Sequence, residues 1–231
     1  KPDAPAAMPH DPERAYASMG NYIFNTDVLI EVLQAAHRDG KHDFGLHILP
    51  DLISEKRLFA YDFSTNRVPG VYAHEEQNYW RDVGTIEAFF AANQDILGER
   101  PRFDLFNPEW PIYSSPYHGP TSTVIAGQIH NALLGSGTYI NGASVRNSVV
   151  RREVVLEPEV ELDECIIMDY VRIKKGSRLR RVIVDRHNII EAHTQIGYDA
   201  KADAEKYFVS PTGITVLPLA RVNRDTRSYI A

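Results

Sequence analysis

A single carboxylate stands between two large aromatic side chains and a glycine in the stretch Tyr-Trp-Arg-Asp-Val-Gly-Thr at residues 79–85. An aspartate just ahead of a helix has two common uses: it binds a hard cation such as Mg²⁺, or it caps the helix. A Mg²⁺-binding carboxylate usually shares the ion with substrate phosphates. Spacing alone favours the capping role for Asp82 and leaves the metal role open.

Two further residues carry chemistry that suits a phosphate or a sugar. Ser18, close to Gly20, offers a hydroxyl group, and Lys1 offers a positive charge. Each also has a simpler explanation, as a strand serine and as a solvated terminal lysine. The sequence lacks histidine pairs of the zinc type, a Gly-x-Ser-x-Gly elbow and a phosphate-loop glycine pattern, which argues against those enzyme classes.

The elements that must position these residues alternate between strands and helices. Alternating or continuous apolar residues predict strands at 17–24 and 58–63. Apolar residues at helical spacing predict helices at 26–37, 48–56 and 85–97, the last capped by Thr85. This alternation is typical of an α/β domain, which we assign to residues 1–105. A proline-rich linker follows at 106–123.

From about residue 124 the sequence changes to a repeat of 16–17 residues. Three apolar columns follow this repeat: Leu134, Val150, Ile167 and Val184; Ile140, Leu156, Ile173 and Ile190; Val145, Leu162, Leu179 and Ile196. Small or rigid residues mark the corners between them: Gly142, Pro158, Gly176 and Ala192. Three columns in register predict a three-sided parallel β-helix over residues 124–231, in which each coil is buried by its neighbours.

Charge follows the same repeat. Residues 153–169 carry seven acidic and no basic side chains, whereas residues 172–186 carry seven basic side chains and one acid. Stacking would place acid against base on neighbouring coils, in the pairs Glu157–Lys174, Glu161–Arg178, Asp163–Arg180, Glu164–Arg181 and Asp169–Arg186. The alternative is an anion site that uses some of these arginines, and the two are compatible.

Composition bounds the function. The net charge is −6, so no general basic field recruits nucleic acid or an anionic membrane. No apolar run is long enough for a membrane helix. The single cysteine, Cys165, excludes an internal disulfide, is expected to be a buried thiol, and fits a cytoplasmic location.

A set of five motifs resembles the bacterial glucose-1-phosphate adenylyltransferases. They are Lys-Pro at residues 1–2, Ala-Ser-Met-Gly-Asn-Tyr-Ile-Phe at 17–24, His-Asp-Phe-Gly at 42–45, the stretch at 79–85, and Trp-Pro-Ile at 110–112. The β-helix with Val-Asp-Arg at 184–186 continues the match. The resemblance implies an α/β remnant of a Rossmann-like nucleotidyltransferase domain followed by a left-handed parallel β-helix, in a homotetramer.

The resemblance also implies an activity and its residues. The family forms ADP-glucose and pyrophosphate from ATP and glucose 1-phosphate with Mg²⁺, for glycogen biosynthesis. By resemblance, Lys1 contacts the sugar phosphate, Ser18 binds glucose 1-phosphate, and Asp82 is a catalytic metal ligand. Tyr22 and Trp80 shape the sugar side of the pocket. Arg186 matches a position that binds sugar-phosphate or adenylate effectors, although the tail at residues 217–221 diverges.

The family's glycine-rich nucleotide loop and its other catalytic aspartate are absent from this sequence. We therefore expect the chain to be the C-terminal part of the enzyme, inactive alone, and its start at Lys1 to reflect processing or truncation. Three alternatives remain: a pyrophosphorylase that uses UTP or GTP, a non-catalytic β-helix module, and a hexapeptide acyltransferase with His187 or His193 as its base.

Overall fold

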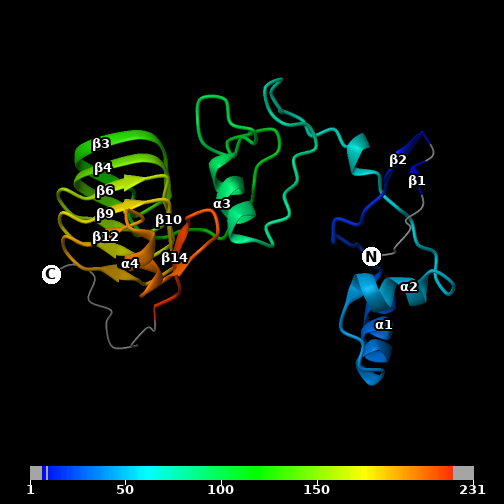
Figure 1. Ribbon diagram of the computed structural model, residues 1–231. Coiled ribbons are helices and arrows are strands. Elements are labelled where there is room, and N and C mark those ends of the chain that lie inside the picture. Colours follow the sequence, from blue (N-terminus) through cyan, green and yellow to red (C-terminus); the bar gives the residue numbers. More distant parts are fainter. Residues whose placement is uncertain (1–6, 9, 221–231) are drawn as a thin grey trace. The chain divides into compact units, whose positions relative to one another are not determined.

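Two units, divided between Thr65 and Asn66, make up the computed structural model, which describes residues 7–8 and 10–220 (Figure 1). In the first unit, β1 (Ala7–Met8) pairs antiparallel with β2 (Asp11–Ala15). α1 (Thr26–Arg38) follows, and a π-helical turn at Phe44–Ile48 leads into α2 (Leu49–Leu52). A short 3₁₀ turn at Phe63–Thr65 ends the unit. Its small core contains Val32, Ala36, Ile48 and Leu52.

The two strands predicted in this region are wrong. Residues 17–24 and 58–62 have neither helix nor strand structure, and Ile23 is fully exposed. A strand is stable only when a neighbour satisfies its backbone hydrogen bonds, and no described segment pairs with either stretch. The helix predicted at 26–37 is confirmed as α1, whereas the helix predicted at 48–56 is shorter.

In the second unit, α3 (Ile86–Gln94) begins after Thr85, whose side chain accepts a hydrogen bond from the Ala88 amide at 3.1 Å. This confirms the helix and its predicted cap, although the helix ends at Gln94 and not at residue 97 as predicted. The remaining elements, apart from one short helix, are strands. The strands are β3 (Thr123–Leu134), β4 (Tyr139–Val150), β5 (Val155–Leu156), β6 (Glu161–Asp163), β7 (Ile166–Ile167), β8 (Arg172–Ile173), β9 (Arg178–Arg180), β10 (Val182–Val184), β11 (Ile189–Ile190), β12 (Gln195–Ile196), β13 (Phe208–Val209) and β14 (Thr215–Leu217). The helix, α4 (Ala200–Ala204), lies between β12 and β13.

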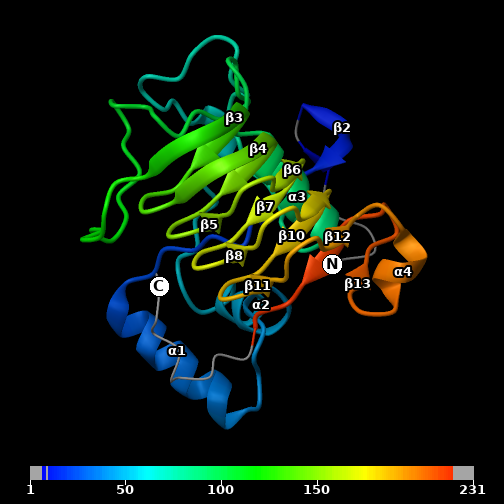
Figure 2. The same cartoon turned by 90° about the vertical axis from the view of Figure 1, so that its left-hand side faces the viewer.

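Apart from β13, which pairs antiparallel with β14, these strands form a parallel β-helix, as predicted. Figure 1 shows β3, β4, β6, β9 and β12 stacked on one side of it, and Figure 2 shows β5, β8 and β11 on another. All three predicted apolar columns are in register. In one of them Val145 pairs with Leu162, Leu162 with Leu179, and Leu179 with Ile196. The inward side chains of the central coils are completely buried.

Each coil turns at residues with positive φ. One corner uses Glu153, Tyr170 and His187, with φ of 51°, 62° and 61°. Another uses Gly142, Glu159, Gly176 and His193. The turn residue thus comes one position after the predicted corners Pro158 and Ala192. Most of these positions are not glycine, so the stacked coils, rather than local preference, hold the backbone there.

The charge ladder is only partly as predicted. Glu161–Arg178 and Glu164–Arg181 form ion pairs of 2.9 and 3.0 Å. Glu157 instead pairs with Arg172, Asp163 with Arg146, and Asp169 with Arg151 and Arg152. Asp163 and Asp169 pair with arginines of the preceding coil instead of those predicted on the following coil, and Glu157 pairs with Arg172 instead of the predicted Lys174 on the same coil. The pairs still link coils, so they help to specify register.

α3 packs on the outer face of the β-helix (Figure 2). Phe90 lies in a cluster with Ile166, Ile183 and Ile214, which point outward from the β7, β10 and β14 side. The Arg181 guanidinium lies 5.6 Å from the centre of the Phe90 ring, and Thr212 donates a 3.1 Å hydrogen bond to Glu87. The residues that precede α3 are therefore anchored to the solenoid.

Replacing Leu162 by alanine should remove a central inward side chain that neighbouring coils cannot replace. We expect the free energy of unfolding, measured by urea titration of this chain, to fall by about 2–5 kcal/mol. Ile189→Ala provides the control, because Ile189 is 59% exposed on the outside of the same solenoid. Equal losses in the two variants would contradict the assignment of the core.

Cys165 should be chemically silent in the folded chain. Its side chain is fully buried, and this burial raises the pKa of the thiol to about 12. We expect no reaction with a thiol reagent at pH 8 under native conditions and complete reaction in denaturant. Ser136→Cys, at an exposed position, should react at once in both conditions. Fast native labelling of Cys165 would contradict its burial.

Candidate active site

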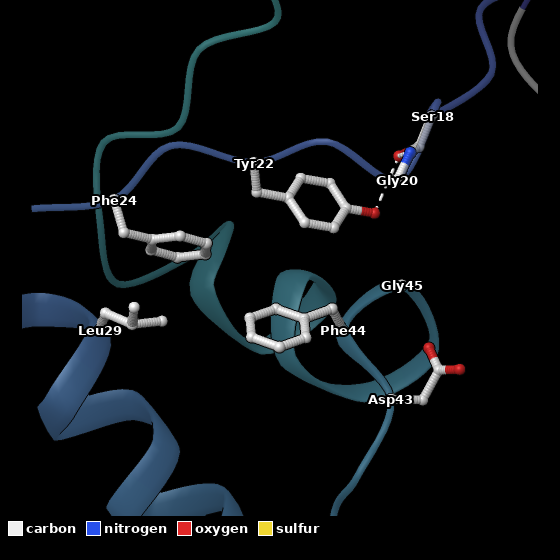
Figure 3. Close-up of a pocket in the computed structure, with 8 residues that line it drawn as sticks. All are labelled: Ser18, Gly20, Tyr22, Phe24, Leu29, Asp43, Phe44 and Gly45. Carbon is white, nitrogen blue, oxygen red and sulfur yellow. Dashed lines mark hydrogen bonds between the residues drawn. The ribbon is translucent and has the colours of Figure 1, made fainter. Parts of the chain in front are cut away.

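An open hollow of about 650 Å³ lies in the first unit (Figure 3). It is lined by Ser18, Gly20, Tyr22, Phe24, Leu29, Asp43, Phe44 and Gly45. The Tyr22 and Phe44 rings stack with centroids 5.9 Å apart and form an apolar wall. Hydroxyl and carboxylate groups at its rim complete a lining that suits a sugar, which has one apolar face and many hydroxyls.

The polar groups of this hollow are already oriented. The Ser18 and Tyr22 hydroxyls are hydrogen-bonded at 2.8 Å, and the Gly20 amide donates to Ser18 at 3.1 Å. The predicted pair Ser18 and Tyr22 is thus brought together by a turn at Gly20, where φ is +77°. A hydroxyl held in this way can donate to an incoming oxygen without a large loss of side-chain entropy.

Asp43 and Phe44 were not predicted as site residues. The Asp43 carboxylate accepts a hydrogen bond from the Leu46 amide at 2.7 Å and so caps the turn at Phe44–Ile48. Its position in the His-Asp-Phe-Gly motif was the available signal, but that motif served only to support the family resemblance. The structure gives the motif a local purpose, since it shapes one wall of the hollow (Figure 3).

Asp82 does not cap α3. It is exposed, and its Oδ1 accepts a hydrogen bond from the Gly84 amide at 3.1 Å, while Thr85 fills the cap position. In the part of the chain that the structure describes, no basic side chain forms an ion pair with Asp82. The capping explanation for Asp82 is therefore wrong, and its carboxylate is available to a ligand.

The residue before Asp82 is held by a dense polar cluster. Arg81 donates from Nε to Asp95 at 2.9 Å and from Nη1 and Nη2 to the two oxygens of Glu76 at 2.8 and 2.5 Å. Its guanidinium also lies 4.3 Å from the centre of the Tyr79 ring, which stacks on Phe103. Sequence reasoning missed this cluster because its members come from separate segments.

The electrostatics of this cluster favour the charged forms of Glu76 and Arg81 and the neutral form of Tyr79. The hydrogen bond from Arg81 lowers the pKa of Glu76, although burial opposes this effect. The same bond raises the pKa of Arg81. Burial and the nearby Asp95 carboxylate raise the pKa of Tyr79, so its hydroxyl remains a donor to Asp95 at 3.2 Å.

Two buried polar side chains fix the loops on either side. Glu75 accepts hydrogen bonds from the amides of Tyr72 and Asp104 at 2.7 and 2.8 Å. Asn107 donates to the Pro69 carbonyl at 2.8 Å. Gly70, with φ of +74°, lies so close to Asn107 that an added Cβ would be 2.2 Å from its oxygen. These contacts replace the regular structure that this segment lacks.

The other predicted site residues lie elsewhere. Trp80 directly precedes Arg81 and is exposed, at 39% of its surface. Arg186 lies on the β-helix and is 3.5 Å from the Asp185 carboxylate, which immediately precedes it. Lys1 lies outside the described residues. Ser18 and Tyr22 belong to the first unit, whereas Trp80 and Asp82 belong to the second.

Comparison with known proteins covers most of the chain. Residues 1–99 match a family model described as nucleotidyl transferase, and residues 120–217 match one described as GlmU-like, C-terminal hexapeptide. The glucose-1-phosphate adenylyltransferase of Thermodesulfovibrio yellowstonii is 44% identical over 95% of this chain and 54% of its own length. Those of Corynebacterium jeikeium and Photobacterium profundum are 36% and 37% identical over 94% of this chain, and 54% and 55% of their own lengths.

The resemblance to the glucose-1-phosphate adenylyltransferases is confirmed. So is the predicted order of a nucleotidyltransferase region followed by a hexapeptide-type β-helix. The chain spans about half the length of the curated adenylyltransferases it matches.

A divalent cation fits Asp82 as one ligand among several. Among the described residues, no group of three or more histidine, cysteine, aspartate or glutamate side chains is placed to hold a metal ion. Mg²⁺ is commonly bound by one or two carboxylates, with phosphate and water oxygens completing its octahedron. An exposed carboxylate with a fixed backbone suits this arrangement.

No helix in the described part of the chain is long and apolar enough to span a membrane.

Asp82→Asn should leave the fold intact, because Asp82 forms neither a helix cap nor an ion pair in the described structure. We expect the unfolding free energy of this chain to change by less than about 0.5 kcal/mol. Thr85→Ala, which removes the true cap of α3, should cost about 1 kcal/mol. Urea titration of both variants measures these values, and a larger loss for Asp82→Asn would restore the capping role.

Proposed function

We propose that this chain is part of a glucose-1-phosphate adenylyltransferase, which forms ADP-glucose and pyrophosphate from ATP and glucose 1-phosphate. The observation that carries the proposal is the 44% identity to such an enzyme along 95% of the chain. The structure supports it with an open hollow of mixed apolar and polar lining in the nucleotidyltransferase region, and with an exposed carboxylate in the Trp-Arg-Asp-Val-Gly-Thr element that forms no ion pair among the described residues.

In this proposal the first unit binds the sugar phosphate. The Tyr22 and Phe44 rings contact the apolar face of glucose, and the Asp43 carboxylate accepts from sugar hydroxyls. Ser18 donates to glucose 1-phosphate. Lys1 neutralises part of the phosphate charge as the two anionic substrates approach each other.

Asp82 is the proposed metal ligand. A Mg²⁺ ion held by Asp82 would neutralise phosphate charge during the attack of the sugar-phosphate oxygen on the α-phosphorus of ATP. The chain contributes a carboxylate whose backbone is fixed by the Arg81 cluster on one side and the Thr85 cap on the other. Trp80 is proposed, from the family resemblance alone, to help shape the sugar side of the pocket.

The wider setting completes the proposal. We infer a homotetramer in the cytoplasm, in the service of glycogen biosynthesis, with sugar-phosphate or adenylate effectors. Arg186 is the proposed effector contact, since its only ion pair in the described structure is a 3.5 Å contact to an adjacent carboxylate. An anion can displace such a contact at small cost.

The test uses the complete enzyme and measures pyrophosphate release from ATP and glucose 1-phosphate. Ser18→Ala should raise the KM for glucose 1-phosphate about ten-fold or more, because a hydrogen bond to a charged group is lost. The KM for ATP should change much less. Ser136→Ala, at an exposed position on the β-helix, is the matched control.

Two results would overturn the proposal. Equal turnover with UTP in place of ATP would indicate a different pyrophosphorylase. An unchanged KM for glucose 1-phosphate in Ser18→Ala would remove the hollow from the active site.

A further inference from the structure

A free guanidinium at Arg81 would compete with a cation for the carboxylate of the neighbouring residue, Asp82. A guanidinium binds a carboxylate through two parallel hydrogen bonds and occupies both oxygens. Arg81 is adjacent to Asp82 in the sequence, and a long flexible side chain at that position can reach the carboxylate. Such a pair would compete with any cation for Asp82.

The structure shows where the Arg81 donors go instead. Arginine has five N–H groups. Nε bonds Asp95, Nη2 bonds Glu76, and Nη1 bonds both Glu76 and the Trp80 carbonyl, the last at 3.0 Å. The flat face of the guanidinium lies over the Tyr79 ring. Most of its hydrogen-bonding capacity is therefore used away from Asp82.

The two acceptors are well placed to retain Arg81. The Asp95 side chain is 14% exposed and follows α3 directly, so its position is set by a helix anchored on the β-helix. Glu76 is 40% exposed but binds in bidentate fashion. A second cation, Arg102, approaches the same carboxylates only at 3.6 and 3.9 Å. Arg81 is thus their principal partner.

We propose that Arg81 is a positioning residue, and that Glu76 and Asp95 hold its guanidinium so that the Asp82 carboxylate stays free for a divalent cation. This rests on the proposed function, in which Asp82 binds the metal. The arrangement also explains why a basic residue can stand next to a metal ligand without weakening it.

The decisive variant removes one acceptor and so releases Arg81. In the complete enzyme saturated with ADP-glucose, we measure Mn²⁺ binding through the electron paramagnetic resonance signal of the free ion. Glu76→Gln should weaken Mn²⁺ binding about five-fold, since the freed guanidinium pairs with Asp82. The Mg²⁺ concentration for half-maximal activity should rise by a similar factor, with kcat at saturating Mg²⁺ nearly unchanged. Glu99→Gln, which changes an exposed carboxylate that forms no ion pair among the described residues, should change neither quantity.

A double variant separates this role from simple stabilisation. Arg81→Gln combined with Glu76→Gln removes the competing cation as well as its acceptor, so Mn²⁺ affinity should return to within about two-fold of the wild-type value. A purely structural cluster predicts that the double variant binds Mn²⁺ no better than Glu76→Gln. That result, or unchanged binding in Glu76→Gln, would overturn the inference.

Asp82→Asn distinguishes the inference from the function on which it rests. Undiminished Mn²⁺ binding in Asp82→Asn would remove Asp82 from the metal site and the proposed function would fail at that step. Lost binding in Asp82→Asn together with normal binding in Glu76→Gln would leave the function in place and exclude only the role of Arg81.

Discussion

The burial of Phe90 against the outside of the β-helix is the contact on which α3 and the segment before it depend. It joins a short helix to three strands that come from different coils, and it removes a large aromatic side chain from water, worth roughly 1.5–3 kcal/mol. The residues before α3 have no regular structure of their own. Their positions follow from the position of the helix, which follows from this contact. A solenoid that is rigid because its coils bury one another thus supports an irregular segment that carries Asp82.

Polar contacts, rather than apolar packing, hold the segment that precedes α3. The segment from residue 66 to the start of α3 contains few buried apolar side chains, and Glu75, Asn107 and the Arg81 cluster bind its backbone instead. Hydrogen bonds are directional, so they fix a loop more sharply than apolar contacts of similar strength. In the proposed function, the Asp82 carboxylate meets a cation and a phosphate, and it needs such a fixed backbone because small displacements are costly in phosphoryl transfer.

The β-helix could be predicted almost residue by residue, since each inward position repeats along the chain and a one-residue slip would expose a whole column. Leu162 and Ile173 were placed correctly for this reason. The predictions of strands at 17–24 and 58–63 were wrong, because strand formation depends on a partner that single-sequence patterns do not reveal. The Arg81 cluster was missed for a related reason: Glu76, Tyr79, Asp95 and Phe103 meet only after folding. Asp82 could be singled out because its motif is local, and its metal-binding role stays a prediction.

The last strand of the solenoid shows how such a fold can grow. After β12 the chain leaves the coil through α4 and β13, yet β14 returns in register, with Val184 opposite Leu217. Ile214, which begins this return, also contributes to the surface under Phe90. An excursion at a corner is therefore free to lengthen or shorten over evolution, whereas its point of re-entry is not. Variation among homologues should concentrate between β12 and β13 and stop abruptly at Ile214, because that residue serves two neighbours at once.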